Sequence, residues 1–87
     1  MRPDDSIDAY NAATTRDSND SKAWNNKGIA FGYLGRPDEA IKAFDKAIEV
    51  NSTASNAWNN KGVALKHLNK SNEALEAYNK SIEMNPT

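Results

Sequence analysis

The sequence predicts an all-α protein of five helices stacked in antiparallel pairs, and three observations predict this fold. The segment Ala23–Gly28 returns unchanged as Ala57–Gly62, 34 residues later. About half of the aligned positions between residues 21–53 and 55–87 are identical. Within each copy, apolar residues recur at the spacing of a helix, and short stretches rich in Gly, Pro, Asn and Ser separate the periodic segments. The chain is therefore predicted to be built from repeated helical hairpins.

The first twenty residues match only the second half of a repeat. With the same offset of 34, Ile7 aligns with Ile41, and Tyr10 aligns with Phe44. A helix is expected around Ile7–Thr14. We therefore interpret residues 1–20 as the second helix of a truncated preceding repeat, followed by full repeats at 21–54 and 55–87.

Each full repeat is predicted to contain two helices. In the first repeat, Ser21–Leu34 and Asp38–Val50 each gather their apolar residues on one arc, and Gly35-Arg36-Pro37 separates them. Proline is tolerated in the first turn of a helix, so Pro37 can begin the second one. In the second repeat, the polar segment 69–72 supplies capping residues between two similar helices, the last of them Ser71–Met84.

Gly28 and Gly62 fall in the middle of the first helix of each repeat. Glycine there costs about 1 kcal/mol relative to alanine. The simplest reason to retain it is the close approach of a neighbouring helix. Ala40 and Ala74 offer matching small surfaces, while Trp24 and the other large aromatic residues are expected to fill the wider gaps.

These residues resemble the tetratricopeptide repeat, whose pattern is W-x₂-L-G-x₂-Y, then A-x₃-F, then P, over 34 residues. The first copy supplies Trp24, Lys27, Gly28, Phe31, Ala40, Phe44 and Ala47, and the second supplies Trp58, Lys61, Gly62, Leu65, Ala74, Tyr78, Ser81 and Pro86. The two lysines replace the usual leucine, and each can lay its stem on the core edge with its ammonium group in water. The resemblance implies a short right-handed α-solenoid, in which the first helix of each pair lines a concave groove. In this family the groove commonly receives an extended peptide or a helix of a partner protein.

Helical spacing independently identifies a polar face opposite the apolar arc of each first helix. Carboxamide side chains dominate this face, and each can donate to and accept from a peptide backbone. We therefore interpret it as a peptide-binding groove formed by Lys22, Asn25, Asn26, Ile29, Tyr33, Asn56, Asn59, Asn60, Val63 and His67.

Two alternatives for this face stay open. The asparagines could be solvated surface residues of an Asn-rich protein, and the two copies could match because one was duplicated recently. A third reading is disfavoured. Some members of the family hold a C-terminal carboxylate in a clamp of Lys, Asn and Arg residues, and Lys22, Asn26 and Asn60 match clamp positions. However, no arginine follows in the right place.

Composition argues against several other classes of function. The net charge is −1, and no basic patch indicates a nucleic-acid or membrane partner. The chain has no cysteine, and His67 is its single histidine, so the sequence indicates neither a metal site nor a cofactor. No catalytic motif is present, and an enzyme is not expected. The N-terminal residues lack the apolar region of a secretion signal, which favours a cytoplasmic location.

The sequence therefore predicts a protein-interaction scaffold that binds a peptide or helix in its groove. Its alternative is a structural solenoid segment that forms homo-oligomers through its terminal helices. Terminal repeats of such arrays usually need a polar cap. The last helix, Ser71–Met84, shows no such cap in the sequence, so Leu75 and Tyr78 are expected to be partly exposed.

Overall fold

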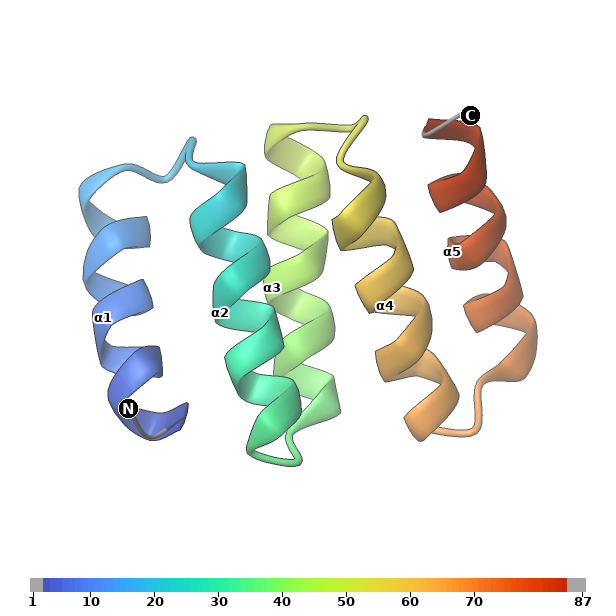
Figure 1. Cartoon of the computed structure of the whole chain (residues 1–87), viewed down its shortest axis with the longest axis horizontal. Helices are drawn as coiled ribbons and strands as arrows, with labels where there is room; N and C mark the ends of the chain where they lie inside the picture. Colours follow the sequence, from blue (N-terminus) through green and yellow to red (C-terminus); the bar gives the residue numbers. More distant parts are fainter. Residues whose placement is uncertain (1–2, 85–87) are drawn as a thin grey trace.

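A computed structural model of the chain describes residues 3–84, and within them it contains five α-helices and no strand. The helices are α1 (Pro3–Arg16), α2 (Ser21–Tyr33), α3 (Pro37–Val50), α4 (Ser55–His67) and α5 (Ser71–Met84). Successive helices run in opposite directions and lie side by side in chain order (Figure 1). This arrangement confirms the predicted all-α solenoid of antiparallel helix pairs. Pro86, the last residue of the repeat pattern, lies outside the described residues.

Local sequence explains where α2 begins and ends. The carboxylate of Asp20 accepts a hydrogen bond from the backbone N–H of Ala23 at 3.1 Å, which caps the first turn. At the other end, Gly35 adopts φ 70°, which favours glycine. The N–H of Arg36 donates to the carbonyl of Phe31, and the N–H of Gly35 donates to that of Gly32, both at 3.0 Å. These two bonds form a Schellman motif, which ends the helix.

Helix α4 ends in the same way, although it has no glycine there. Asn69 takes the left-handed conformation with φ 62°, and its N–H donates to the carbonyl of Lys66 at 3.0 Å. The N–H of Lys70 completes the motif by donating to the carbonyl of Leu65 at 3.0 Å. The polar segment 69–72 thus ends α4 as well as preceding α5, because asparagine tolerates this conformation better than most residues.

The core is built from small residues and a few rings. Ala47 and Ala57 have 0% exposure, Ala40 has 1%, and Phe44 has 3%. A Cβ atom added to Gly28 would overlap the Phe44 ring, and one added to Gly62 would lie 2.7 Å from Cε1 of Tyr78. The close approach predicted from the two glycines is therefore confirmed, and its partner is an aromatic ring from the second helix of the same repeat.

The two tryptophans are only partly buried. Both are half-buried, and their indole N–H groups donate to the carbonyls of Ser18 (2.9 Å) and Ser52 (3.2 Å) in the preceding loops. The Lys27 ammonium lies 4.8 Å from the ring centroid of Trp24. Each tryptophan therefore holds the loop before its helix, because its N–H needs a polar partner that the core does not provide.

Helix α5 exposes two large apolar side chains. Leu75 is 59% exposed and Ile82 is 69% exposed, whereas the equivalent residues of α3, Ile41 and Ile48, are partly buried. The predicted partial exposure of Leu75 and Tyr78 is confirmed, since Leu75 is exposed and Tyr78 is half-buried beside α4. None of the helices described between residues 3 and 84 is long and apolar enough to cross a membrane.

Candidate functional site

A cavity of about 560 Å³ lies between α2 and α4, with its floor on α3. We call it the α2–α4 cavity. Its volume lies within the usual range for ligand sites. It is lined by Gly28, Ile29, Gly32, Tyr33, Gly35, Pro37, Ala40, Phe44, Asn60, Val63, Ala64 and His67.

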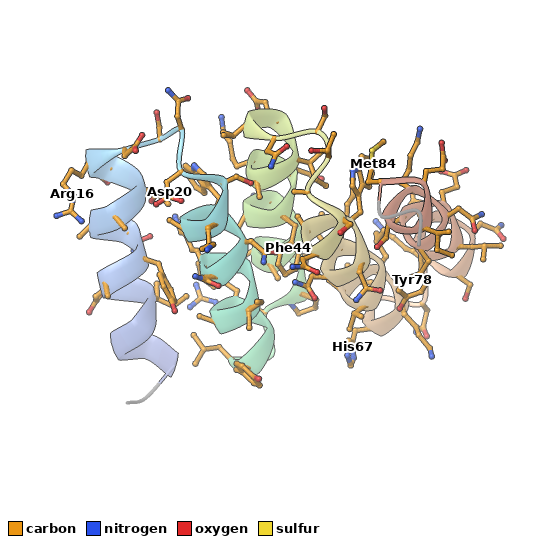
Figure 2. All side chains as sticks on the ribbon, turned by 45° about the horizontal axis from the view of Figure 1, so that its top comes forward. Arg16, Asp20, Phe44, His67, Tyr78 and Met84 are labelled. Carbon is orange, nitrogen blue, oxygen red and sulfur yellow. The ribbon has the colours of Figure 1, made fainter. Side chains whose placement is uncertain are left out.

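Helical spacing and one tight turn bring these residues together. On α4 the lining residues lie three, four and seven positions after Asn60, so they share one face of the helix. The turn at Gly35 places Pro37 at the start of α3, and both residues line the cavity. Phe44 lies inside the helix stack, and His67 projects from the end of α4 (Figure 2).

The lining of this cavity contains no Lys, Arg, Asp or Glu. Its floor consists of the buried side chains of Ala40 and Phe44, and its walls include Ile29 and Val63. A ligand group placed here would exchange water for apolar contacts, which favours an apolar group. It would meet no Lys, Arg, Asp or Glu side chain, which disfavours a carboxylate or an ammonium group.

At the edge of the cavity, two carboxamides join the repeats. The amide Nδ2 of Asn60 donates to Oδ1 of Asn25 at 3.1 Å, which links α4 to α2 across 35 residues of sequence. One N–H and one oxygen lone pair are used in this bond. Each amide retains further donor and acceptor capacity. Both side chains are half-buried, so the pair offers fixed donors and acceptors beside an apolar cavity.

The structure distributes the ten predicted groove residues unevenly. Five of them line the cavity, namely Ile29, Tyr33, Asn60, Val63 and His67. Asn25 is not in the lining but accepts the hydrogen bond from Asn60 at its edge. The remaining four predicted residues lie outside the lining, namely Lys22, Asn26, Asn56 and Asn59.

Sequence reasoning missed the floor of the cavity and its glycine wall. Ala40 and Phe44 come from the second helix of the repeat, which helical spacing assigned to the core alone. Gly32 carries the one signal that was available in the sequence, because it is a second glycine within a predicted helix.

A second cavity, of about 970 Å³, lies between α3 and α5 on the other side of α4. We call it the α3–α5 cavity. Its lining includes five carboxylates and four lysines around Ile41, Trp58 and Leu65. The ammonium group of Lys61 lies 2.7 Å from the carboxylate of Asp45. The lining therefore carries charges of both signs, and Lys61 and Asp45 form an ion pair with each other.

Between residues 3 and 84, no group of three or more His, Cys, Asp or Glu side chains could hold a metal ion. His67 is exposed at the end of α4.

Comparison with known proteins gives the context for this geometry. The family model of the tetratricopeptide repeat matches residues 21–53 and 55–87. The first TPR of Spaghetti (RPAP3), solved with the HSP90 peptide SRMEEVD, superposes with a TM-score of 0.94 at 25% identity, over 98% of this chain and 68% of that one. YrrB, described as a TPR protein with an unusual peptide-binding site, gives a TM-score of 0.90 at 26% identity, over 97% of this chain and 43% of that one.

MamA is also similar, with a TM-score of 0.86 at 26% identity over 90% of this chain. The chain spans 46% of the length of that MamA structure, which is less than half. No curated protein sequence matches the chain at a significant level.

Proposed function

This chain belongs to the tetratricopeptide repeat family, and we propose that it is a protein-interaction module whose α2–α4 cavity forms part of a concave groove that binds a peptide segment of a partner. The observation that carries the proposal is a cavity without Lys, Arg, Asp or Glu in its lining, with an apolar floor and an amide pair at its edge. Such a combination of apolar surface and a few oriented polar groups is typical of binding sites. We propose neither a catalytic role nor a cofactor, and the cytoplasmic location stays a prediction.

The peptide is proposed to bind in an extended form along α2 and α4. An extended chain exposes its backbone N–H and C=O groups, and the carboxamides of Asn25 and Asn60 can pair with both kinds of group. Neighbouring predicted residues on the same faces, such as Asn26 and Asn59, would continue the contacts. These backbone contacts do not themselves depend on the side chains of the peptide.

The chemistry of the groove differs from what an acidic peptide would require. The first TPR of Spaghetti was solved with a peptide that contains three acidic residues, SRMEEVD. The lining of the α2–α4 cavity in this chain has neither lysine nor arginine. We therefore do not propose an acidic chain terminus as the ligand.

A selection from a random dodecapeptide library displayed on phage would test the groove. Peptides enriched on the wild-type chain should lose at least about tenfold in affinity for Val63→Arg, because an arginine would fill an apolar cavity wall that is 41% exposed. The matched control is Leu75→Arg, which makes the same kind of change at an exposed helical position outside this cavity. Circular dichroism checks that both variants stay helical. If enriched peptides bind Val63→Arg as well as they bind the wild type, the groove proposal is wrong.

A second candidate function is self-association through α5, and the exposure of Leu75 and Ile82 favours it. Exposed apolar residues on one terminal helix can pair with another apolar surface. Sedimentation over a range of protein concentrations should then show dimers or larger species that Leu75→Lys with Ile82→Lys removes. A wild-type chain that stays monomeric at high concentration would exclude this candidate.

A further inference from the structure

Three of the four glycines have a clear structural reason, and one does not. Gly28 and Gly62 lie directly under the rings of Phe44 and Tyr78, where a Cβ atom would overlap the ring. Gly35 has φ 70° in the turn after α2. Gly32 is exposed and lies within α2, and a Cβ atom built on it would have no heavy atom within 4 Å.

The fold therefore does not need a glycine at position 32. Glycine is the least favourable helix residue after proline, and alanine is the most favourable. Alanine would fit at this position without contact and would stabilise α2. The chain thus retains a residue that weakens its helix, at a position where the fold has room for a side chain.

The open space above Gly32 is the α2–α4 cavity. Gly32 belongs to its lining, together with Ile29 on the same helix and Val63 and Ala64 on α4. A large side chain at position 32 would project into this space. The missing side chain therefore increases the room that a ligand can occupy.

From this arrangement we infer that Gly32 keeps open a socket for one large apolar side chain of the bound peptide, which makes that side chain the anchor of recognition. This inference rests on the proposed peptide-binding function and adds the class of ligand. The lining of the socket includes no Lys, Arg, Asp or Glu, so a charged anchor would lose its hydration without gaining an ion pair with any of these residues. A leucine, methionine or phenylalanine side chain would instead contact Ile29, Val63 and the Phe44 floor.

The division of roles follows from the geometry. The Asn25–Asn60 pair at the edge contacts the peptide backbone, and the socket selects one side chain. Buried apolar anchors in a pocket commonly supply most of the affinity of such interfaces. The ligands are therefore peptide segments with one obligatory large apolar residue, and the residues on either side of it can vary.

The dodecapeptides selected on the wild-type chain supply the probe for this inference. They should share one large apolar residue, and changing that residue to aspartate should weaken binding at least about tenfold, as should Gly32→Leu in the protein. Ala12→Leu is the control, because it places the same leucine side chain at an exposed position of α1 without a charge change. Its affinity should equal that of the wild type.

A second arm does not depend on any ligand. Gly32→Ala should raise the melting temperature by about 4 °C, because it improves the helix without a clash. A lower melting temperature would show that the fold itself requires this glycine, and the inference would be overturned while the groove proposal stood.

The remaining outcomes separate the two proposals. If Val63→Arg abolishes binding but Gly32→Leu does not, or if the selected peptides lack a common apolar residue, the socket is wrong and the groove is right. If no selected peptide depends on Val63, both proposals are wrong.

Discussion

The two cavities on either side of α4 differ in size and in chemistry. The α3–α5 cavity is the larger, about 970 Å³ against about 560 Å³, and nine of its lining residues are charged. The α2–α4 cavity has no Asp, Glu, Lys or Arg in its lining, and its floor is buried and apolar. Size alone would favour the α3–α5 cavity as the binding site. The comparison shows why size is a poor guide. Side chains that already form ion pairs with each other, such as Lys61 and Asp45, offer a ligand little additional binding free energy.

Helix α4 illustrates the contrast within a single element. Val63 faces the α2–α4 cavity, and Lys61, two residues earlier, faces the α3–α5 cavity. The same helix thus presents an apolar wall to one side and an ion pair to the other. Substitutions on the two sides should therefore differ in kind.

The largest expected effect is on the floor of the α2–α4 cavity. Phe44→Ala should lower the free energy of unfolding by about 3–5 kcal/mol, because a ring with 3% exposure leaves a void. Tyr78→Ala, at the equivalent position of the second repeat, should cost less because that ring is half-buried. Urea unfolding followed by circular dichroism measures both, and equal losses would contradict the predicted difference.

The next effect concerns an apolar residue in the lining of the α3–α5 cavity. Ile41 packs against both core clusters, so Ile41→Ala should cost about 2 kcal/mol. Leu75, its equivalent in the second repeat, is 59% exposed, and Leu75→Ala should cost less than about 0.5 kcal/mol. If thermal or urea unfolding finds a loss for Leu75→Ala as large as that for Ile41→Ala, Leu75 must be covered in solution, as self-association would require.

A smaller effect is expected at the edge of the α2–α4 cavity. Asn25→Ala removes the acceptor of the hydrogen bond from Asn60 and should cost about 1 kcal/mol. Asn59→Ala serves as the control, because Asn59 is exposed and has no role in this pair. A neutral Asn25→Ala in urea unfolding would show that the pair adds no stability between the repeats.

The smallest effect is expected for the ion pair of the α3–α5 cavity. Lys61→Met should change stability by less than about 1 kcal/mol, because Asp45 is half exposed and water screens the pair. Peptide affinity should not change, since Lys61 does not line the α2–α4 cavity. If fluorescence titration finds a loss of peptide affinity for Lys61→Met, the peptide binds on the other side of α4, in the α3–α5 cavity.

Much of the fold could be predicted from the sequence. The 34-residue offset and the helical spacing predicted five helices, and the mid-helix glycines predicted the close contacts of Gly28 and Gly62. These features depend on local pattern, which a single sequence records directly.

The candidate site was less predictable, because helical spacing gives the direction of a side chain on its own helix and not what lies across from it. It placed Val63 on the groove face but could not show that Phe44 of α3 forms the floor beneath it. The bond between Asn25 and Asn60 likewise depends on how α2 and α4 approach each other. The partial exposure of Trp24 depends on a loop carbonyl that no periodicity reveals.

Amide chemical shifts of the ¹⁵N-labelled chain, measured while a selected dodecapeptide is added, test the central claim most directly. The two tryptophans provide indole N–H signals away from the α2–α4 cavity, since both donate to loop carbonyls. The account predicts shifts at Ile29, Tyr33 and Val63, with both indole signals unchanged. Shifts of the indole signals and of Lys61, with Ile29 and Val63 unchanged, would contradict it.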